Sequence, residues 1–510
     1  MAEKSRSSVI GIKEESTEGT LIELASGSEF TEIKPGFSVN SSVETVESDV
    51  LVDDIGASEP FVTKETPTVS LSKPLKHSGV EGQAPDYAVI VKSAMGSQTD
   101  NSTEYDTVSS STAGTSSAAA TLIVDSGEGA SFAEGQAVLI KDGTNGYSVR
   151  NAKSISSDTL TLNYNLSTAP ASGVNLGKAV HFAPATDDHP TFSVHHYQSS
   201  ASSSSLHQAV AGCRTTSMSL NFPANDIATM DFEIEGIKSF RNGIVVSSSN
   251  NKINFIDVSM GSELTATLSS KTYQSPKELA AEVGTKMNAA GTNGDTISCS
   301  FDSTTGKYTI ETDGSYLDID WATGTDAANA ADTILGFAAD VTGATTYTGT
   351  ASTYNTSLTP AFDAASPFVV KNQELMIGNF SRNDCRSGNN FSVSISTPKS
   401  DVDDFCSETG VSGSVVLSRE VTASTTLTFT AHDVDEYDAL INNTTTSLMF
   451  NGGEKGADGN WVAGKVVNVY MPNAKITSNV IADNDGIMVV EIEAKGFVTT
   501  GDKDIHINYL

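Results

Sequence analysis

The chain has 510 residues, of which 63 are acidic and 30 are basic, so its net charge is −33. This length predicts two to four domains. Because affinity for a nucleic-acid backbone comes from Lys and Arg, the charge excludes a protein that grips DNA or RNA. Acidity of this kind suits a wall that repels DNA, and it equally suits an extracellular or halotolerant protein that must stay in solution. Charge alone leaves both open.

Targeting signals and cysteines indicate the cellular compartment of the protein and the state of its thiols. The first residues, MAEKSRSSVIGIKEE, lack the apolar stretch of a secretory signal, and no window approaches the roughly 18 apolar residues of a membrane span. We therefore expect a protein that is made in a cytoplasm and stays there until it assembles. The spacing of the cysteines fits neither a disulfide framework nor a zinc ribbon, and predicts buried reduced thiols at Cys213, Cys299, Cys385 and Cys406.

Strand patterns dominate the first 185 residues. In residues 1–92, the runs 20–24 and 88–92 are apolar and β-branched and predict strands. A Ser/Thr/Ala-rich run from Ser109 to Ala120 then opens a new module, assigned to residues 93–185. Its strands are predicted at 121–124, 137–140 and 159–162, and their spacing favours a small barrel or sandwich.

Residues 186–240 contain two alternating strands around a tight turn, Pro223-Ala224-Asn225-Asp226. The side chains expected on the apolar face of these strands are Thr216, Met218, Leu220 and Phe222 before the turn, and Ile227, Met230, Phe232 and Ile234 after it. The acidic residues Asp231, Glu233 and Glu235 alternate with the second set. They must therefore face water or a neighbouring subunit, and they are the candidate lumen or ring-contact residues.

Residues 241–356 predict a second inserted module of mixed helix and strand. Ser275-Pro276-Lys277-Glu278 is a helix start, with an N-cap, a proline in the first turn and Glu three residues after the cap. The stripe Leu279, Val283 and Met287 faces the core. A hairpin is expected over 297–310, Trp321 is expected in the core, and a second, Ala-rich helix is expected over 326–335.

Residues 357–510 return to β patterns. One helix is predicted to begin at Asp433, with Tyr437, Leu440 and Ile441 facing inward. The Gly-rich run 452–459 is interpreted as a loop before the strand at Trp461. Strands over 465–476 and 487–494 form a hairpin around Asp483–Gly486.

No residue pattern indicates an enzyme, a cofactor or a metal. His189, His195, His196 and His207 cluster near Cys213, but His195 and His196 are adjacent and face opposite sides of a strand, so the group matches no zinc motif. A pH-sensitive ring contact is the other interpretation of this cluster. The acidic runs at 401–404, 433–435 and 483–486 lack the complete calcium-loop pattern. Nucleophile elbows, P-loops and dinucleotide fingerprints do not occur.

Three segments together resemble one family, the major tail tube proteins of long-tailed (siphovirus-type) bacteriophages. The segment from His207 to Lys238, HQAVAGCRTTSMSLNFPANDIATMDFEIEGIK, is similar to a run in the family's tube-forming domain. The opening EESTEGT at 14–20 resembles the family's usual start, and KVVNVYMPNAKI at 465–476 resembles its closing hairpin. The resemblance covers roughly 1–92, 186–240 and 357–510, and it leaves 93–185 and 241–356 as two inserted small β-rich domains.

This resemblance implies a mainly β fold, a tail-tube-type sandwich or split barrel with a few short helices. It implies a virion structural protein, assembled in the host cytoplasm, that forms stacked rings, expected to be hexameric, around a lumen through which DNA passes. The implied partners are copies of the same chain, the tape measure protein inside the tube, and the tail terminator and baseplate or tip proteins. DNA would pass without specific binding.

The alternative class is a surface adhesin or carbohydrate-binding β-protein. Ser/Thr-rich β-modules suit such a protein. Against it stand the missing export signal and the presence of only two tryptophans, Trp321 and Trp461, because sugar stacking needs exposed aromatic rings.

Overall fold

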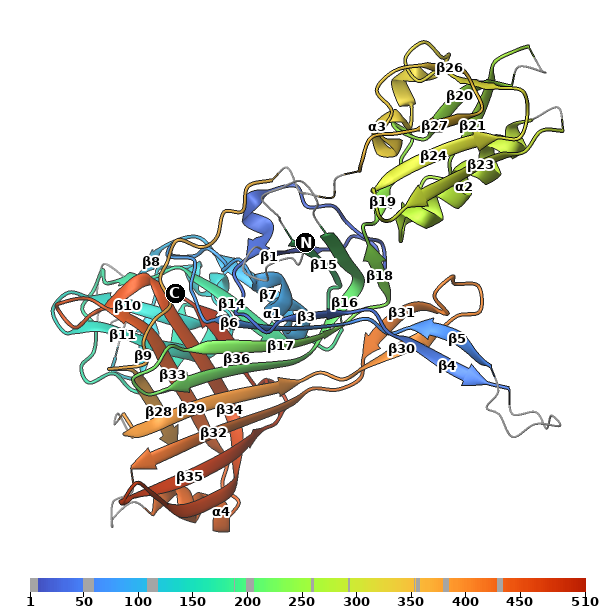
Figure 1. The fold of residues 1–510 in the computed structure, drawn as a ribbon. Coiled ribbons are helices and arrows are strands. Elements are labelled where there is room, and N and C mark those ends of the chain that lie inside the picture. The colour runs from blue at the N-terminus through green and yellow to red at the C-terminus, as the bar shows by residue number, and fades with distance from the viewer. Residues whose placement is uncertain are drawn as a thin grey trace. The chain divides into compact units, whose positions relative to one another are not determined.

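A computed structural model describes residues 8–48, 59–107, 118–187, 189–198, 206–257, 261–291, 294–352, 354, 358–378, 385–428 and 434–510. The chain forms two compact units (Figure 1). Unit 1 comprises Met1–Gly11, Ser193–Ala211 and Lys238–Thr359; unit 2 comprises Ile12–Phe192, Gly212–Ile237 and Pro360–Leu510. Strands hold 51% and helices 10% of the residues, which confirms the mainly β prediction.

Unit 2 is built on a large antiparallel sheet, here called the first sheet. Its strands, in order of pairing, are β3 (Ser38–Asn40), β6 (Thr68–Pro74), β17 (Thr229–Glu235), residues 214–223 of β16 (Leu206–Pro223), β29 (Gly388–Ser396), β32 (Glu420–Thr428) and β35 (Ile487–Gly496). Along these strands, apolar and polar residues alternate, as is typical of a sheet with one buried face and one face in water.

A second sheet of unit 2 packs on the buried face of the first. It consists of β28 (Glu374–Gly378), β33 (Thr446–Lys455), β34 (Trp461–Asn484), β36 (His506–Tyr509), β14 (Ala179–Pro184) and β7 (Gly96–Asn101). The long strand β34 joins the two sheets, because its first half pairs with β33 and β36 while its second half pairs with β35. Between the sheets, the Phe222 and Phe450 rings lie with centroids 4.3 Å apart. This arrangement is a β-sandwich.

The hairpin of β16 and β17 forms where the sequence predicts it. Asp226 N donates to Pro223 O at 3.3 Å, and Asn225 adopts a left-handed conformation with φ +63°. Asn tolerates that conformation better than other non-glycine residues, which explains the turn. The expectation for Ile227 is wrong: its side chain is 42% exposed, and Ala228 takes the buried place because the strand begins only at Thr229.

A smaller sheet of six strands lies within residues 105–176. Its order is β8 (Tyr105–Asp106), β13 (Asn175–Leu176), β10 (Ala137–Asp142), β11 (Gly146–Ser156), β12 (Thr159–Leu162) and β9 (Thr121–Ile123). A bridge between Thr107 and Val124 joins its two ends into a small barrel, and the strands expected at 121–124, 137–140 and 159–162 are all present.

This barrel packs against the outer face of the second sheet. Ala137, Leu139 and Val149 form one apolar cluster with Trp461 and Leu510. Fully buried amides also cross the contact: Asn151 Nδ2 donates to Asn468 Oδ1 at 2.8 Å, and Asn508 Oδ1 accepts from Ala137 N at 3.0 Å. Because buried amides cost free energy when they are unpaired, this network fixes how the barrel sits on the sheet.

Two strand predictions in residues 1–92 are wrong. Residues 20–24 have no regular secondary structure. Residues 88–92 belong to helix α1 (Ala88–Met95), which ends at Gly96 with φ +97°. Its β-branched side chains suggested a strand, but Ile90, Val91 and Ala94 are all fully buried, and this tertiary burial outweighs local propensity.

In unit 1, most of the described residues form an α+β structure. Helix α2 (Pro276–Ala290) begins as predicted, with the Ser275 side chain accepting from Glu278 N and Pro276 in the first turn. A four-stranded sheet runs β21 (Leu264–Thr267), β20 (Lys252–Asp257), β25 (Leu317–Ile319), β26 (Val341–Ala344), and a three-stranded sheet runs β23 (Ile297–Asp302), β24 (Lys307–Thr312), β27 (Thr346–Thr348). The hairpin expected over 297–310 is therefore confirmed.

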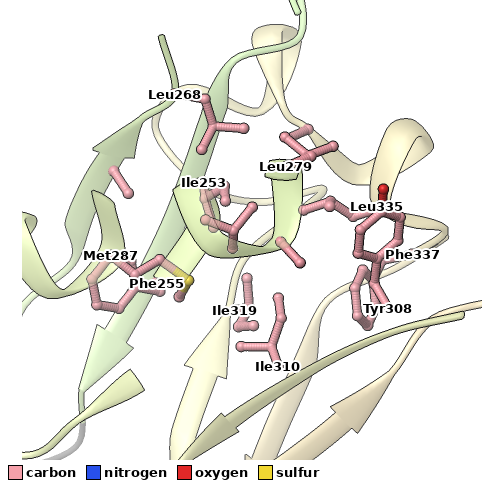
Figure 2. Packing of buried hydrophobic residues seen from close by; sticks show 14 of the residues in the cluster. Ile253, Phe255, Leu268, Leu279, Met287, Tyr308, Ile310, Ile319, Leu335 and Phe337 are labelled. Carbon is pink, nitrogen blue, oxygen red and sulfur yellow. The ribbon is translucent and has the colours of Figure 1, made fainter. Parts of the chain in front are cut away.

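The core of this structure lies between α2 and the two sheets (Figure 2). Leu279, Val283 and Met287 of α2 all belong to this core, as the predicted apolar stripe requires, and Met287 lies beside Phe255 (Figure 2). Trp321 is 2% exposed and stacks on Phe337 at 5.1 Å, which confirms its core role. The helix expected over 326–335 is broken into a 3-10 turn, Ala327–Asn329, and a short helix α3 (Asp332–Leu335).

The remaining strands outside the exposed hairpins described below are β1 (Ser8–Glu14), β2 (Phe30–Thr31), β15 (Phe192–Gln198), β18 (Lys238–Arg241), β19 (Ile244–Val245) and β22 (Thr272–Tyr273).

Three details of residues 385–510 correct the sequence expectations. The predicted helix exists as α4 (Asp435–Ile441), but Asp433 lies outside the described residues, and Tyr437 and Ile441 are 53% and 64% exposed instead of facing inward. Glu436 is the buried residue of this helix, because it pairs with Arg386. The Gly-rich run is not a loop throughout, since β33 continues to Lys455.

The cysteines are free, as predicted, but their burial differs from the expectation. Cys213 is buried and Cys299 is half-buried, whereas Cys385 and Cys406 are exposed. Among the described residues, no helix is both long and apolar enough to cross a membrane.

Candidate assembly surfaces

The predicted residues Asp231, Glu233 and Glu235 form an exposed row on β17, while Phe232 and Ile234 between them are buried. Asn221 Nδ2 donates to Asp231 Oδ2 at 2.9 Å, and Ser70 Oγ donates to Glu233 Oε2. Local hydroxyl and amide groups thus orient Asp231 and Glu233 without neutralising them, whereas Glu235 lies 4.0 Å from Lys399 Nζ.

The register of the first sheet extends this row across five strands. Asp231 lies opposite Ser219, Ser219 opposite Ser394, Ser394 opposite Thr422, and Thr422 opposite Lys495. Residues directly opposite one another on paired strands share a face. A parallel row places Glu233, Ser217, Ser396 and Glu420 side by side, and Ser424 stands opposite Glu493.

The exposed side of the first sheet is therefore acidic and rich in small hydroxyl groups. We call it the acidic face, and its exposed acidic residues are Asp231, Glu233, Glu235, Glu420, Glu491 and Glu493. Lys495 pairs with Glu420 across two of its strands at 2.5 Å. The sequence identified the first three acids. It missed Glu420, although the alternation of apolar residues with Ser and Thr in 391–396 and 420–428 carries the same signal.

Two hairpins of unit 2 project together from one end of this sheet (Figure 1). They are β4 (Val43–Glu47) with β5 (Pro60–Glu65), and β30 (Lys399–Asp403) with β31 (Val411–Val416). Lys64 Nζ reaches Asp401 Oδ2 at 3.3 Å, which ties the hairpins to each other. We call them the apolar arm, because they expose the apolar side chains of Val43, Val46, Phe61, Val62, Val402, Phe405, Val415 and Leu417.

A second group of exposed apolar residues lies where β34 and β35 meet beside α4. We call it the tip patch; its residues are Val434, Tyr437, Val480, Ile481, Ile487 and Met488. Tyr437 and Ile481 line a common cavity of about 150 Å³ with Val490 and Ile492. The hairpin turn itself is formed as predicted, with Gly486 N donating to Asp483 Oδ1 at 2.7 Å.

The apolar arm and the tip patch lie at opposite ends of the first sheet. Strand β32 begins at Glu420, just after the arm, and ends at Thr428, whose side chain lines the same cavity as Tyr437. A strand of this length spans about 30 Å. Clusters of exposed apolar groups are typical of surfaces that bind a partner. The chain thus carries two candidate surfaces of this kind, separated by the acidic face.

The histidine cluster is divided between the two units of the chain. His195 Nδ1 lies 3.0 Å from His207 Nε2 in unit 1, and their rings stack. His189 belongs to unit 2, where its Nδ1 lies 2.8 Å from Ser93 O, and Cys213 is buried in that same unit. Burial lowers the pKa of His207 to about 3, and His195 and His196 add to this effect. Burial also lowers the pKa of His189 and the pKa of His196, so His189, His196 and His207 are neutral parts of the fold at neutral pH.

A second histidine pair, which the sequence did not indicate, lies in unit 2. His181 Nε2 is 3.0 Å from His506 Nδ1, and both residues are buried. Burial lowers the pKa of His181 to about 4 and places that of His506 well below its ordinary value, with His181 contributing. In the neutral pair, one ring nitrogen donates to the other; two imidazolium rings at this distance would repel each other.

This pair makes the stability of the subunit depend on pH. The pKa of His181 is lower in the folded chain than in the unfolded chain, so the unfolded chain binds more protons at pH values between the two. The contribution of His181 to stability is therefore complete above about pH 6.5, and it is lost as the pH is lowered to about 4. We expect His181 alone to contribute about 3 kcal/mol to this fall. Urea unfolding at pH 7, 5.5 and 4 should show a shallower pH dependence for His181→Gln than for the wild-type chain; equal slopes would refute this assignment.

Other acidic groups lie in ion pairs, in turns and in one partly exposed cluster. The runs at 401–404 and 483–486 form ion pairs and turns, whereas Asp433 lies outside the described residues. Asp106, Asp125 and Glu128 at the seam of the small barrel bring ligand atoms within 4.8 Å of one another. Burial, with a further contribution from Asp125, raises the pKa of Glu128. Exposed acidic groups of this kind are common without a metal, so the cluster alone does not define a site.

Both tryptophans are 2% exposed, so neither offers a ring for sugar stacking.

The chain matches no protein-family model and no curated protein.

Proposed function

We propose that this protein is the subunit of a hollow phage tail tube, assembling into stacked rings through which DNA passes. The observation that carries the proposal is the placing of the apolar arm and the tip patch at opposite ends of one sheet, with the acidic face between them. Different surfaces at the two ends of a subunit join head to tail, and such contacts produce closed rings or open filaments.

The acidic face supports the conduit role. In a ring formed by such contacts, the face that turns inward would repel the phosphates of passing DNA, because both carry negative charge. Its small Ser and Thr side chains offer no apolar hold to a moving duplex. The sandwich of unit 2, with its strand β34 shared by two sheets, is the part that we assign to the tube wall.

The proposal includes the tape measure protein in the lumen, and the tail terminator and baseplate proteins at the tube ends, as partners. The proposal keeps two additions to the tube wall, within 93–185 and 241–356. Of residues 93–185, the addition is the small barrel at 105–176, because β7 and β14 at the two ends belong to the second sheet of the sandwich. We expect the concentrated purified protein to form hollow filaments of even width, visible by negative-stain electron microscopy.

A further inference from the structure

The core of unit 2 contains a lysine and an aspartate side by side. Lys73 follows Val69 and Leu71 on the buried face of β6, where a third apolar residue would be expected. Its Nζ lies 2.6 Å from Asp86 Oδ1, and the two side chains are only 2% and 4% exposed. Removing two charges from water in this way costs more than their attraction usually returns, so stability alone does not explain the pair.

The surroundings of the pair are aromatic and hydrogen-bonded. Lys73 Nζ lies 4.0 Å from the centroid of the Tyr87 ring, and Tyr87 is fully buried. Thr31 Oγ1 donates to Asp86 Oδ1 at 2.8 Å, and Lys73 Nζ donates to Thr31 Oγ1. These contacts hold Lys73 Nζ beside Asp86 Oδ1. This oxygen is bonded to Asp86 Cγ, the carbon that a lysine amine would attack.

A second carboxyl group completes the site. Asp363 Oδ2 accepts a hydrogen bond from Asp86 N at 2.9 Å, and this carboxyl interacts electrostatically with both Lys73 and Asp86. Burial raises the pKa of Asp363, which favours its protonated form. Burial also lowers the pKa of Lys73, which favours the neutral, nucleophilic amine.

We propose that Lys73 and Asp86 form an intramolecular isopeptide bond, with Asp363 as the residue that positions and relays the proton. The Lys73 ammonium first gives one proton to the Asp86 carboxylate. The Nζ lone pair then attacks Asp86 Cγ, a C–N bond forms, and the C–OH bond breaks. The second proton of the amine leaves through Asp363 to the departing hydroxyl, so that one water is released and no oxidant or cofactor is consumed.

The bond would join β6 of the first sheet covalently to the segment that leads into α1. Held in this way, the sandwich core cannot open between the two elements when the subunit is under tension or heated. The inference does not depend on tube assembly, because it concerns the folded subunit alone.

Mass spectrometry of the denatured full-length chain tests the proposal. We expect a mass lower than the sequence requires by one water molecule. Trypsin should leave peptides 65–76 and 77–92 joined, because Lys73 precedes a proline and is not cleaved while Lys76 is. Fragment ions must place the junction at Lys73 and Asp86, since the uncleaved linear peptide 65–92 has the same mass. Recovery of the two peptides only in separate form would overturn the proposal.

Three variants separate chemistry from folding. Asp86→Asn should become lighter than its own sequence by one ammonia instead of one water, because the amide nitrogen is then the leaving group. Lys73→Met should retain its full sequence mass. Asp363→Asn should fold, as shown by circular dichroism, but form the bond several-fold more slowly after refolding. Loss of water from Lys73→Met, or an unchanged rate in Asp363→Asn at equal folding, would contradict the assigned roles.

Discussion

The double substitution Phe61→Asp with Phe405→Asp is expected to abolish assembly while leaving the subunit folded. The two rings are 51% and 100% exposed on the apolar arm, so neither belongs to the buried core of the monomer. Buried aromatic anchors contribute about 2 kcal/mol each to an interface. Losing both weakens assembly by about 4 kcal/mol, roughly a thousandfold in the concentration needed. Sedimentation velocity across a concentration series measures this.

A matched control distinguishes the arm from exposed apolar residues in general. Val80 and Val498 are 57% and 58% exposed, and they lie outside both the arm and the tip patch. The pair Val80→Asp with Val498→Asp introduces the same charges and should assemble as the wild-type chain does. Each variant should unfold within about 0.5 kcal/mol of the wild type in urea. Equal loss of assembly in both double variants would show that added charge, and not the arm, is responsible.

Reversing charge on the acidic face is the second substitution with a large expected effect. Glu233→Lys with Glu235→Lys places two cations per subunit on a row that now carries three acids. In an assembled tube, these lysines would face DNA and release counterions from it, so binding should appear and weaken steeply with salt. We expect filaments of the variant to retain double-stranded DNA at low salt, and a phage carrying it to eject its genome poorly.

The control for this experiment reverses the same number of charges elsewhere. Glu311 is exposed on β24 of unit 1 and Glu454 on β33 of unit 2, and neither lies on the acidic face. Glu311→Lys with Glu454→Lys should leave the filaments without affinity for DNA. If the acidic-face variant forms tubes, retains no DNA and ejects normally, the acidic-lumen hypothesis is wrong.

The sequence predicted the features that depend on local pattern. Period-2 alternation placed Met218, Leu220 and Phe222 inward and the β17 acids outward, and cap chemistry placed the start of α2 at Ser275 and Pro276. In each of these cases the local preference and the tertiary environment agree, so a single sequence contains enough information.

The failures have physical reasons. The β-branched run 88–92 forms helix α1, because the burial of its side chains outweighs the strand propensity of its residues. Tyr437 and Ile441 were predicted to face a core, but both are exposed, and Tyr437 is part of the tip patch. The apolar pattern of a helix is the same whether its apolar side packs on a core or stays exposed. The alignment of Glu420 and Glu493 with β17 depends on strand order, which no local pattern contains. The proximity of Lys73, Asp86 and Asp363 likewise arises only from the packing of distant segments.

Negative-stain electron microscopy of the purified wild-type chain, concentrated stepwise, tests whether the subunit builds a tube. Sheet ends that expose Phe61 at one side and Ile481 at the other should be covered by further copies of the same polypeptide. Long filaments of even width with a stained central channel are the expected result. Single particles of one subunit at every concentration would contradict self-assembly, and with it the proposed function.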